Sequence, residues 1–167
     1  AGIEGIDINA GGTGTLTLAI RDNTLTSAGT ALDIQRTLGT LQITAFHDTV
    51  VTAASAGAGI LVSTATFDAV PGLTLNSVAG ALIFANSAVG TIGAGDLDIF
   101  TDSGAALTAS GTAGFDLDVT ANAGVLVANA GPAAVLSTLD ADLQWNSLTS
   151  ADSAATGVSL TTVTGTF

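Results

Sequence analysis

The sequence has no Cys, no Met and no Tyr, only 2 Pro, and aromatic residues make up just 4% of its 167 positions. Without cysteine the chain can form no disulfide and offers no thiolate for catalysis or metal binding. Few large side chains are available to fill the space between two layers of secondary structure at the density of a protein interior. The 21 Gly and the many Ala, Ser and Thr residues instead favour a narrow core with closely spaced backbones.

Basic residues are nearly absent as well. Arg21 and Arg36 stand against Glu4 and thirteen Asp, which gives a net charge of -12. Such a chain repels phosphate groups, so we expect no binding to nucleic acid and no attraction to anionic membranes. The longest strongly apolar run, Val78 to Ala85, is far too short to span a bilayer, so we expect no membrane insertion. Divalent cations and neutral glycans remain as partners.

The chain begins AGIEGIDINAGG and ends TGTF. The start lacks the basic and apolar regions of a secretory signal peptide. The end reads as part of a strand. We expect a mature chain or a piece of a longer protein.

Strand signals are frequent but short, and they repeat. Two classes of apolar-x-apolar triplet alternate along the chain, with a cycle of about 25 residues. The first class comprises Ile6–Ile8, Leu32–Ile34, Ile60–Val62, Leu82–Phe84, Phe115–Leu117, Val135–Ser137 and Val158–Leu160. The second comprises Leu16–Leu18, Leu41–Ile43, Leu73–Leu75, Leu97–Ile99, Val125–Val127 and Leu143–Trp145, with Phe167 opening a seventh. A third element occurs only in longer cycles, at Leu25, Val51, Leu107 and Leu148.

A unit of this size cannot bury its apolar face alone, but stacked units can. The pattern predicts an all-β fold: a single-stranded right-handed parallel β-helix of about seven coils of roughly 25 residues, forming one domain over residues 1–167. In each triplet the outer two residues should point inward and the middle one outward. The phrase NTLTSAGTALDI (Asn23 to Ile34) returns as NSLTSADSAATGVSL (Asn146 to Leu160). It should mark a third strand, a corner and the next first strand.

Hydrogen bonds in such a helix run from coil to coil. The first and last coils therefore present open edges, and we see no capping helix in the sequence. This predicts self-association or end-to-end stacking, as in a fragment or stackable subunit of a longer assembly.

The stretch from Gly104 to Phe167, above all AGPAAVLSTLDADLQWNSLTS and ATGVSLTTVTGTF, carries a resemblance. It resembles the repeat regions of large bacterial cell-surface and secreted β-helix proteins of the adhesin or autotransporter-passenger kind. The resemblance extends less crisply over the rest of the chain. It implies export to the extracellular space or cell surface and a structural or adhesive role, with contacts to glycans or host surfaces. It brings no catalytic residues to this sequence.

Two pairs of aspartates are candidate calcium ligands. Asp7 and Asp33 occupy equivalent outward positions on adjacent coils, and so do Asp22 and Asp48. Stacked carboxylates repel each other, and calcium, which prefers several oxygen ligands, would relieve that repulsion. The alternative is a solvated, salt-screened face without any metal.

Asp-x-Asp pairs occur at Asp96/Asp98, Asp116/Asp118 and Asp140/Asp142. Asp116 and Asp118 share a strand face, and β-helix glycosidases use such carboxylates as acid and base. Every segment between strands is short, however, so the loops that would build a cleft are missing. We expect no enzymatic activity and no cofactor, and treat these residues as solubilising turn and surface groups.

Trp145 aligns with inward positions, so we expect it in the core or at the end of the stack; a glycan-stacking platform is the alternative. The leading hypothesis for function is a non-catalytic structural or adhesive segment: a rigid surface stalk, passenger or self-assembling filament segment. A polysaccharide-active enzyme and a calcium-stabilised binding module are the alternatives.

Overall fold

The fold is known from a computed structural model, which describes residues 6–21, 23–36, 40–47, 49–52, 58–63, 66–67, 75–79, 81–85, 91–93, 97–111 and 116–167. These residues form strands and no helix. The strands are β1 (Ile6–Ala10), β2 (Thr15–Arg21), β3 (Thr24–Thr26), β4 (Leu32–Arg36), β5 (Thr40–His47), β6 (Thr49–Thr52), β7 (Ala58–Ser63), β8 (Thr66–Phe67), β9 (Leu75–Ala79), β10 (Ala81–Ala85), β11 (Thr91–Gly93), β12 (Asp98–Thr101), β13 (Leu107–Ser110), β14 (Asp116–Ala128), β15 (Ala134–Ser150) and β16 (Val158–Thr166).

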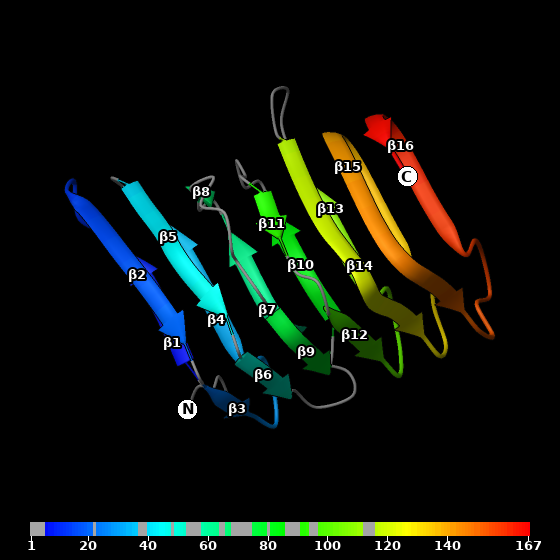
Figure 1. Ribbon diagram of the computed structural model, residues 1–167, viewed down its shortest axis with the longest axis horizontal. Coiled ribbons are helices and arrows are strands. Elements are labelled where there is room, and N and C mark those ends of the chain that lie inside the picture. Colours follow the sequence, from blue (N-terminus) through cyan, green and yellow to red (C-terminus); the bar gives the residue numbers. More distant parts are fainter. Residues whose placement is uncertain are drawn as a thin grey trace.

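All pairings between the described strands are parallel, and each joins one coil to the next. A first face stacks β1, β4, β7, β10, β13, β15 and β16 in chain order. The column of equivalent residues on this face runs Ile6, Leu32, Ile60, Leu82, Leu107, Ala134 and Val158. The chain is therefore a β-solenoid, and Figure 1 shows its strands side by side from the blue N-terminal end to the red C-terminal end.

A third face stacks β3, β6, β9 and β12 with the ends of β14 and β15. Its column runs Leu25, Val51, Val78, Ile99, Leu126 and Leu148. Leu25 and Leu148 thus occupy the same column, and Leu32 and Val158 share the column of the first face. This confirms that the repeated phrase marks a third strand, a corner and a first strand.

The second face consists of two separate ladders in the described residues. One joins β2, β5 and β8, and the other joins β11 with the middle of β14 and β15 and with β16. The structure is an all-β solenoid of about four turns, fewer than the seven coils predicted.

Part of the predicted strand order is wrong in the later coils. Leu75, Ile99 and Leu126 belong to triplets expected in the second class, but their strands pair on the third face. Leu117, expected in a triplet of the first class, pairs with Ala141 on the second face.

Leu107 was expected in the third element but lies on the first face, opposite Leu82. The triplet expected at Val135–Ser137 is shifted by one residue, because Ala134 and Leu136 are the buried positions. Leu126 was expected to point outward and is 0% exposed. A shift of one residue moves a strand's side chains to its other face, so a single misplaced triplet inverts its neighbours.

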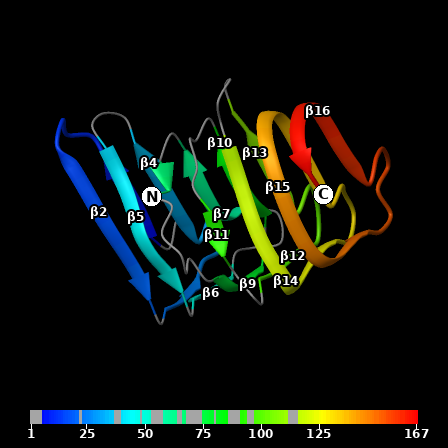
Figure 2. The same cartoon turned by 45° about the horizontal axis from the view of Figure 1, so that its top comes forward.

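The core is a narrow column of aliphatic side chains between the three faces. Its fully buried members include Leu32, Ile34, Leu97, Ile99 and Leu107. Coil-to-coil hydrogen bonds continue through the corner before the first face. There Leu107 N donates to Ala133 O at 3.0 Å, and Ala133 N donates to Gly157 O at 2.7 Å. The described segments include no helix long and apolar enough to cross a membrane. Figure 2 shows the coils around this core from a second direction.

Candidate functional site

Four aspartates form one patch on the outside of the second face. Asp116 and Asp118 lie on β14 directly opposite Asp140 and Asp142 on β15. The residues between them alternate inward: Leu117 on β14 and Ala141 on β15 are fully buried. The period of two along each strand therefore brings both sequence-predicted carbohydrate candidates, Asp116 and Asp118, to the same surface. We call Asp116, Asp118, Asp140 and Asp142 the acidic face.

The acidic face stands next to the last strand. Asp142 Oδ1 accepts a hydrogen bond from Thr166 N at 2.8 Å and a second one from Thr166 Oγ1. Partial removal from water, together with the charges of Asp118, Asp140 and Asp142, raises the pKa of Asp116 above its ordinary value. Asp116 therefore holds a proton more readily than an isolated aspartate.

Carboxylates with unlike environments can divide the roles of acid and base. The acidic face offers such a difference, but it lies on a continuous strand surface. Asp142 also lines a cavity of about 330 Å³ together with Thr120, Thr166 and Phe167. In the described part of the chain, no three His, Cys, Asp or Glu side chains are arranged so that they could hold a metal ion.

Of the two aspartate pairs that are calcium candidates, one lies within the described residues and the other lies outside them. Asp7 and Asp33 face each other across β1 and β4, as expected. The alternative of a solvated face does not hold for Asp33, which is 8% exposed and whose Oδ2 accepts a hydrogen bond from Gln35 Nε2 at 2.8 Å. In the ladder Asp33 lies between Asp7 on β1 and Leu61 on β7. Asp22 and Asp48 lie outside the described residues, so that pair stays a prediction.

The second candidate surface lies at the C-terminal end of the core. There the described chain exposes large apolar side chains: Val158 is 41% exposed, Leu160 49% and Phe167 58%. Leu148, the last residue of the third-face column, is exposed too. We call Leu148, Val158, Leu160 and Phe167 the C-terminal apolar end.

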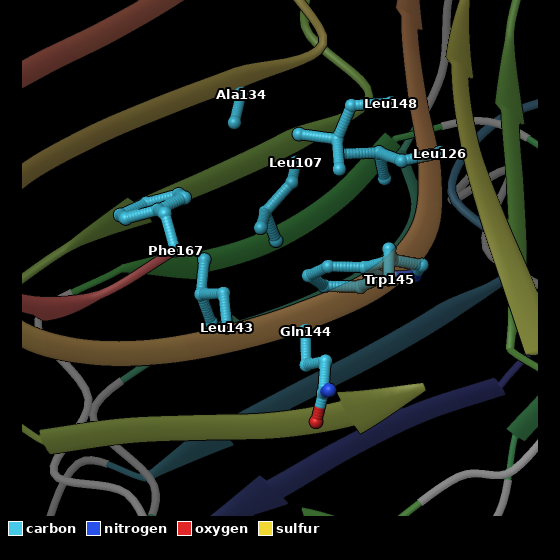
Figure 3. A pocket seen from close by; sticks show the side chains of 8 residues that line it. All are labelled: Leu107, Leu126, Ala134, Leu143, Gln144, Trp145, Leu148 and Phe167. Atoms are coloured by element: carbon cyan, nitrogen blue, oxygen red, sulfur yellow. The ribbon is translucent and has the colours of Figure 1, made fainter. Parts of the chain in front are cut away.

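A cavity of about 350 Å³ opens at this end. Its lining residues are Leu107, Leu126, Ala134, Leu143, Gln144, Trp145, Leu148 and Phe167. Figure 3 shows the apolar side chains turned toward one another, while Gln144 points away from them. The lining comes from all three faces, so the cavity is the mouth of the solenoid interior.

Trp145 lies on the wall of this cavity and packs against the core. Its Nε1 donates to Leu97 O at 3.2 Å, which ties β15 to a segment two coils earlier. The same backbone lies against Gly124, where an added Cβ would stand 2.1 Å from Leu97 O. The expectation that Trp145 sits in the core or at the end of the stack is confirmed, although its strand neighbour is Ala121.

Sequence reasoning missed the cavity. Its signal was present in the first-face column, where Ala134 occupies a position that holds Leu, Ile or Val in the other coils. Leu107, opposite Ala134, is therefore left without a bulky neighbour above it, and it lines the cavity. Because the predicted triplet began at Val135, Ala134 was not recognised as a member of the first-face column.

Comparisons of the chain with protein-family models, with curated proteins and with solved structures found no match. The resemblance to adhesin or autotransporter repeats thus has no support beyond the shared solenoid architecture. Function must be inferred from the chain's own residues.

Proposed function

We propose that this chain is a non-catalytic structural or adhesive β-solenoid. It acts as a rigid stalk, passenger or self-assembling segment in the extracellular space or at a cell surface of the bacterial type. The observation that carries the proposal is the stacking of parallel ladders around an aliphatic core, which ties each described coil to the next. Stacked repeats of this kind form extended, stiff bodies with long exposed surfaces.

The finer features of the architecture belong to the same proposal. We infer a right-handed coil, because connections between parallel strands of one sheet are right-handed in about 98% of cases. Parallel ladders resist bending because every coil is hydrogen-bonded to the next. This stiffness suits a spacer that holds another group away from a surface.

The proposal predicts rod-like behaviour, surface contact and no turnover. Small-angle X-ray scattering of the isolated chain should fit one stiff rod. Surface plasmon resonance on polysaccharide- and protein-coated chips should detect retention, while a panel of polysaccharides should show no release of reducing ends. A flexible scattering profile, or a chain without affinity for glycans, surfaces or itself, would contradict the proposal.

A polysaccharide-active enzyme is a second candidate, which the raised pKa of Asp116 beside three other carboxylates favours. The same panel decides between the two. Turnover that disappears in both Asp116→Asn and Asp118→Asn would establish the enzyme. Thr120→Ser, on the same strand but without a carboxylate change, is the matched control.

A calcium-stabilised module is the third candidate, motivated by the apposition of Asp7 and Asp33. A cation that binds only the folded chain must raise the melting temperature. Scans with calcium and with a chelator test it, and identical melting temperatures would eliminate it.

A further inference from the structure

Phe100 is a large apolar side chain on the outer side of the third face. It lies on β12 between the buried residues Ile99 and Thr101, and it is 42% exposed. Its strand is paired with β9 on one side and with β14 on the other, as Figure 1 shows. Because strands lie on both sides, the ring projects outward from an intact part of the face.

A hydrogen-bonded aspartate and asparagine follow Phe100 at the adjacent corner. Phe100 lies opposite Val127 on β14, and two residues further along the chain from each come Asp102 and Asn129. Asn129 Nδ2 donates to Asp102 Oδ1 at 3.1 Å. The ladder between the coils continues into this corner, because Asn129 N donates to Thr101 O at 2.9 Å. The exposed Asp102–Asn129 pair is therefore held next to the Phe100–Val127 pair.

Both side chains of this polar pair can make further hydrogen bonds. The second carboxylate oxygen of Asp102 and the amide oxygen of Asn129 are acceptors, and the second hydrogen of Asn129 Nδ2 is a donor. Hydroxyl groups match such a mixed set, because each of them both donates and accepts. We call Phe100, Val127, Asp102 and Asn129 the third-face platform.

Size and charge narrow the class of ligand. One phenyl ring and one valine offer far less than the ~800 Å² that each partner buries in a standard protein interface. Anionic ligands are opposed by Asp98 and Asp102 and by the net charge of -12. A neutral sugar meets both conditions, because one face of its ring presents C–H groups that can pack on an aromatic ring and its edge carries hydroxyls.

A cation is also attracted to an aromatic ring beside carboxylates. The two carboxylates that flank Phe100 in the sequence already accept hydrogen bonds from N–H groups, however. Asp98 Oδ1 accepts from Val125 N at 3.0 Å, and Asp102 accepts from Asn129. These donors weaken the attraction of the carboxylates for a cation, so the arrangement favours a neutral ligand.

We propose that the third-face platform binds a neutral glycan, with a sugar ring stacked on Phe100 and its hydroxyls hydrogen-bonded to Asp102 and Asn129. This inference rests on the proposed adhesive function and names its partner and the place where that partner binds. An open surface covers only part of a sugar, so we expect a dissociation constant of about 1 mM for a short oligosaccharide.

Titration of the isotope-labelled chain, followed by two-dimensional NMR, locates the site. The probes are linear hexasaccharides of glucose, mannose and galactose, with polygalacturonate as an anionic probe and hexa-arginine as a cationic one. At least one neutral hexasaccharide should shift the backbone resonances of Phe100, Asp102 and Asn129 progressively. The resonances of the acidic face should not move, and polygalacturonate should have no effect.

Variants at Phe100 separate ring stacking from apolar bulk. Phe100→Ala should weaken binding of that hexasaccharide by about tenfold, and Phe100→Tyr, which keeps the ring, should bind like wild type. Phe100→Leu keeps apolar bulk without a ring and should bind as weakly as Phe100→Ala, which it replaces if the alanine variant does not fold. Circular dichroism verifies the fold of each variant.

Variants at the corner test the polar part of the platform. Asn129→Ala should weaken binding by about fivefold, because it removes hydrogen bonds to the sugar. Thr26→Ala is the matched control, since Thr26 is an exposed member of the outer column to which Phe100 belongs. It should bind like wild type.

Three results would overturn the inference. A wild-type chain whose resonances respond to none of the neutral hexasaccharides has no such glycan site. Shifts that persist unchanged in both Phe100→Ala and Phe100→Leu place glycan binding on another surface. Shifts of Phe100 with hexa-arginine alone, abolished by salt, assign the platform to a basic partner.

The proposed function fails on different evidence. A flexible scattering profile contradicts the stalk even in a chain that binds sugar at Phe100. A stiff rod that adheres through another surface supports the stalk even when the third-face platform binds nothing.

Discussion

The early and late coils of the solenoid leave the first face at corners of different construction. In the first coil, β1 and β2 are separate strands joined by a Gly-rich loop, in which Gly12 and Gly14 have no atom within 4 Å of an added Cβ. In the late coils, β15 and β16 continue from the first face to the second without a loop. The turn is made by Thr138 and Thr162, which have positive φ angles of 58° and 55°.

The comparison shows that the same corner of the solenoid can be built either as an open loop or as a tight turn within a continuous strand. Thr138 lies opposite Thr162, between the paired residues Ser137/Thr161 and Leu139/Val163. A β-branched residue with positive φ is strained, so the tight corner exists because the ladders on both sides hold it. In the early corner neither Gly12 nor Gly14 has a positive φ, so these residues carry no such strain.

The coils differ in backbone spacing as well. Around Gly131 the neighbouring coil is so close that an added Cβ would stand 2.1 Å from Gly104 O. The late coils are thus packed backbone against backbone, with no room for side chains at these corners. A chain with few large side chains reaches a dense interior by this route.

The largest expected effect comes from filling that space. Gly131→Ala should destabilise the fold by about 1–3 kcal/mol, because the Cβ forces two coils apart. Gly12→Ala, the matched change in the open early corner, should stay within about 1 kcal/mol of wild type. Urea unfolding measures both. Equal losses in the two variants would mean that the early corner is packed as tightly as the late one.

A smaller effect of opposite sign is expected at the tight corner. Thr138→Gly should stabilise the chain by about 1 kcal/mol, because glycine adopts positive φ without the steric cost that threonine bears. Thr120→Gly, in the extended part of β14, should destabilise it by roughly 0.5–1 kcal/mol. Thermal unfolding of the two variants gives the comparison. A loss of stability in both would show that the Thr138 hydroxyl matters more than its backbone angle.

The smallest effect concerns the acidic face, which the late coils alone carry among the described residues. A raised pKa in the folded chain means that ionised Asp116 opposes folding, fully above the raised pKa and progressively less as the pH falls through it. Asp116→Asn should therefore stabilise the chain at neutral pH, by no more than about 0.5 kcal/mol for an exposed site. The advantage should vanish below the ordinary value of 3.8.

Urea unfolding at a series of pH values tests this difference. Asp152→Asn, at an exposed corner outside the acidic face, is the control for loss of one negative charge. The interpretation fails if Asp116→Asn is less stable than wild type at neutral pH, or if its advantage grows on acidification.

The repeat could be predicted from the sequence because each triplet consists of neighbouring residues. Apolar-x-apolar triplets such as Ile6–Ile8 and Leu32–Ile34 recur with a spacing that permits parallel stacking, and both pair as expected. The corner phrase at Asn23 and Asn146 likewise marks equivalent positions. The acidic face followed from the same period of two, since Asp116 and Asp118 must share a side of their strand.

The failures share a physical cause. Alanine, serine and threonine fit either side of a strand, so the sequence around Val135 does not say which residue faces the core. The choice depends on how many residues the preceding corner uses, and contacts between coils fix that corner, as where Ala133 N donates to Gly157 O. The burial of Asp33 and the cavity beside Ala134 both depend on which residues neighbouring coils place opposite them.

The sequence by itself determined a strand-rich, cysteine-free, acidic repeat with aliphatic columns, because composition and period are properties of neighbouring residues. Only the tertiary structure decided the registers of the late coils, the positive φ of Thr138 and Thr162, and the open cavity at Trp145. These features arise where one coil meets the next, over separations of about 25 residues, and a slip of one residue there exchanges the inside for the outside.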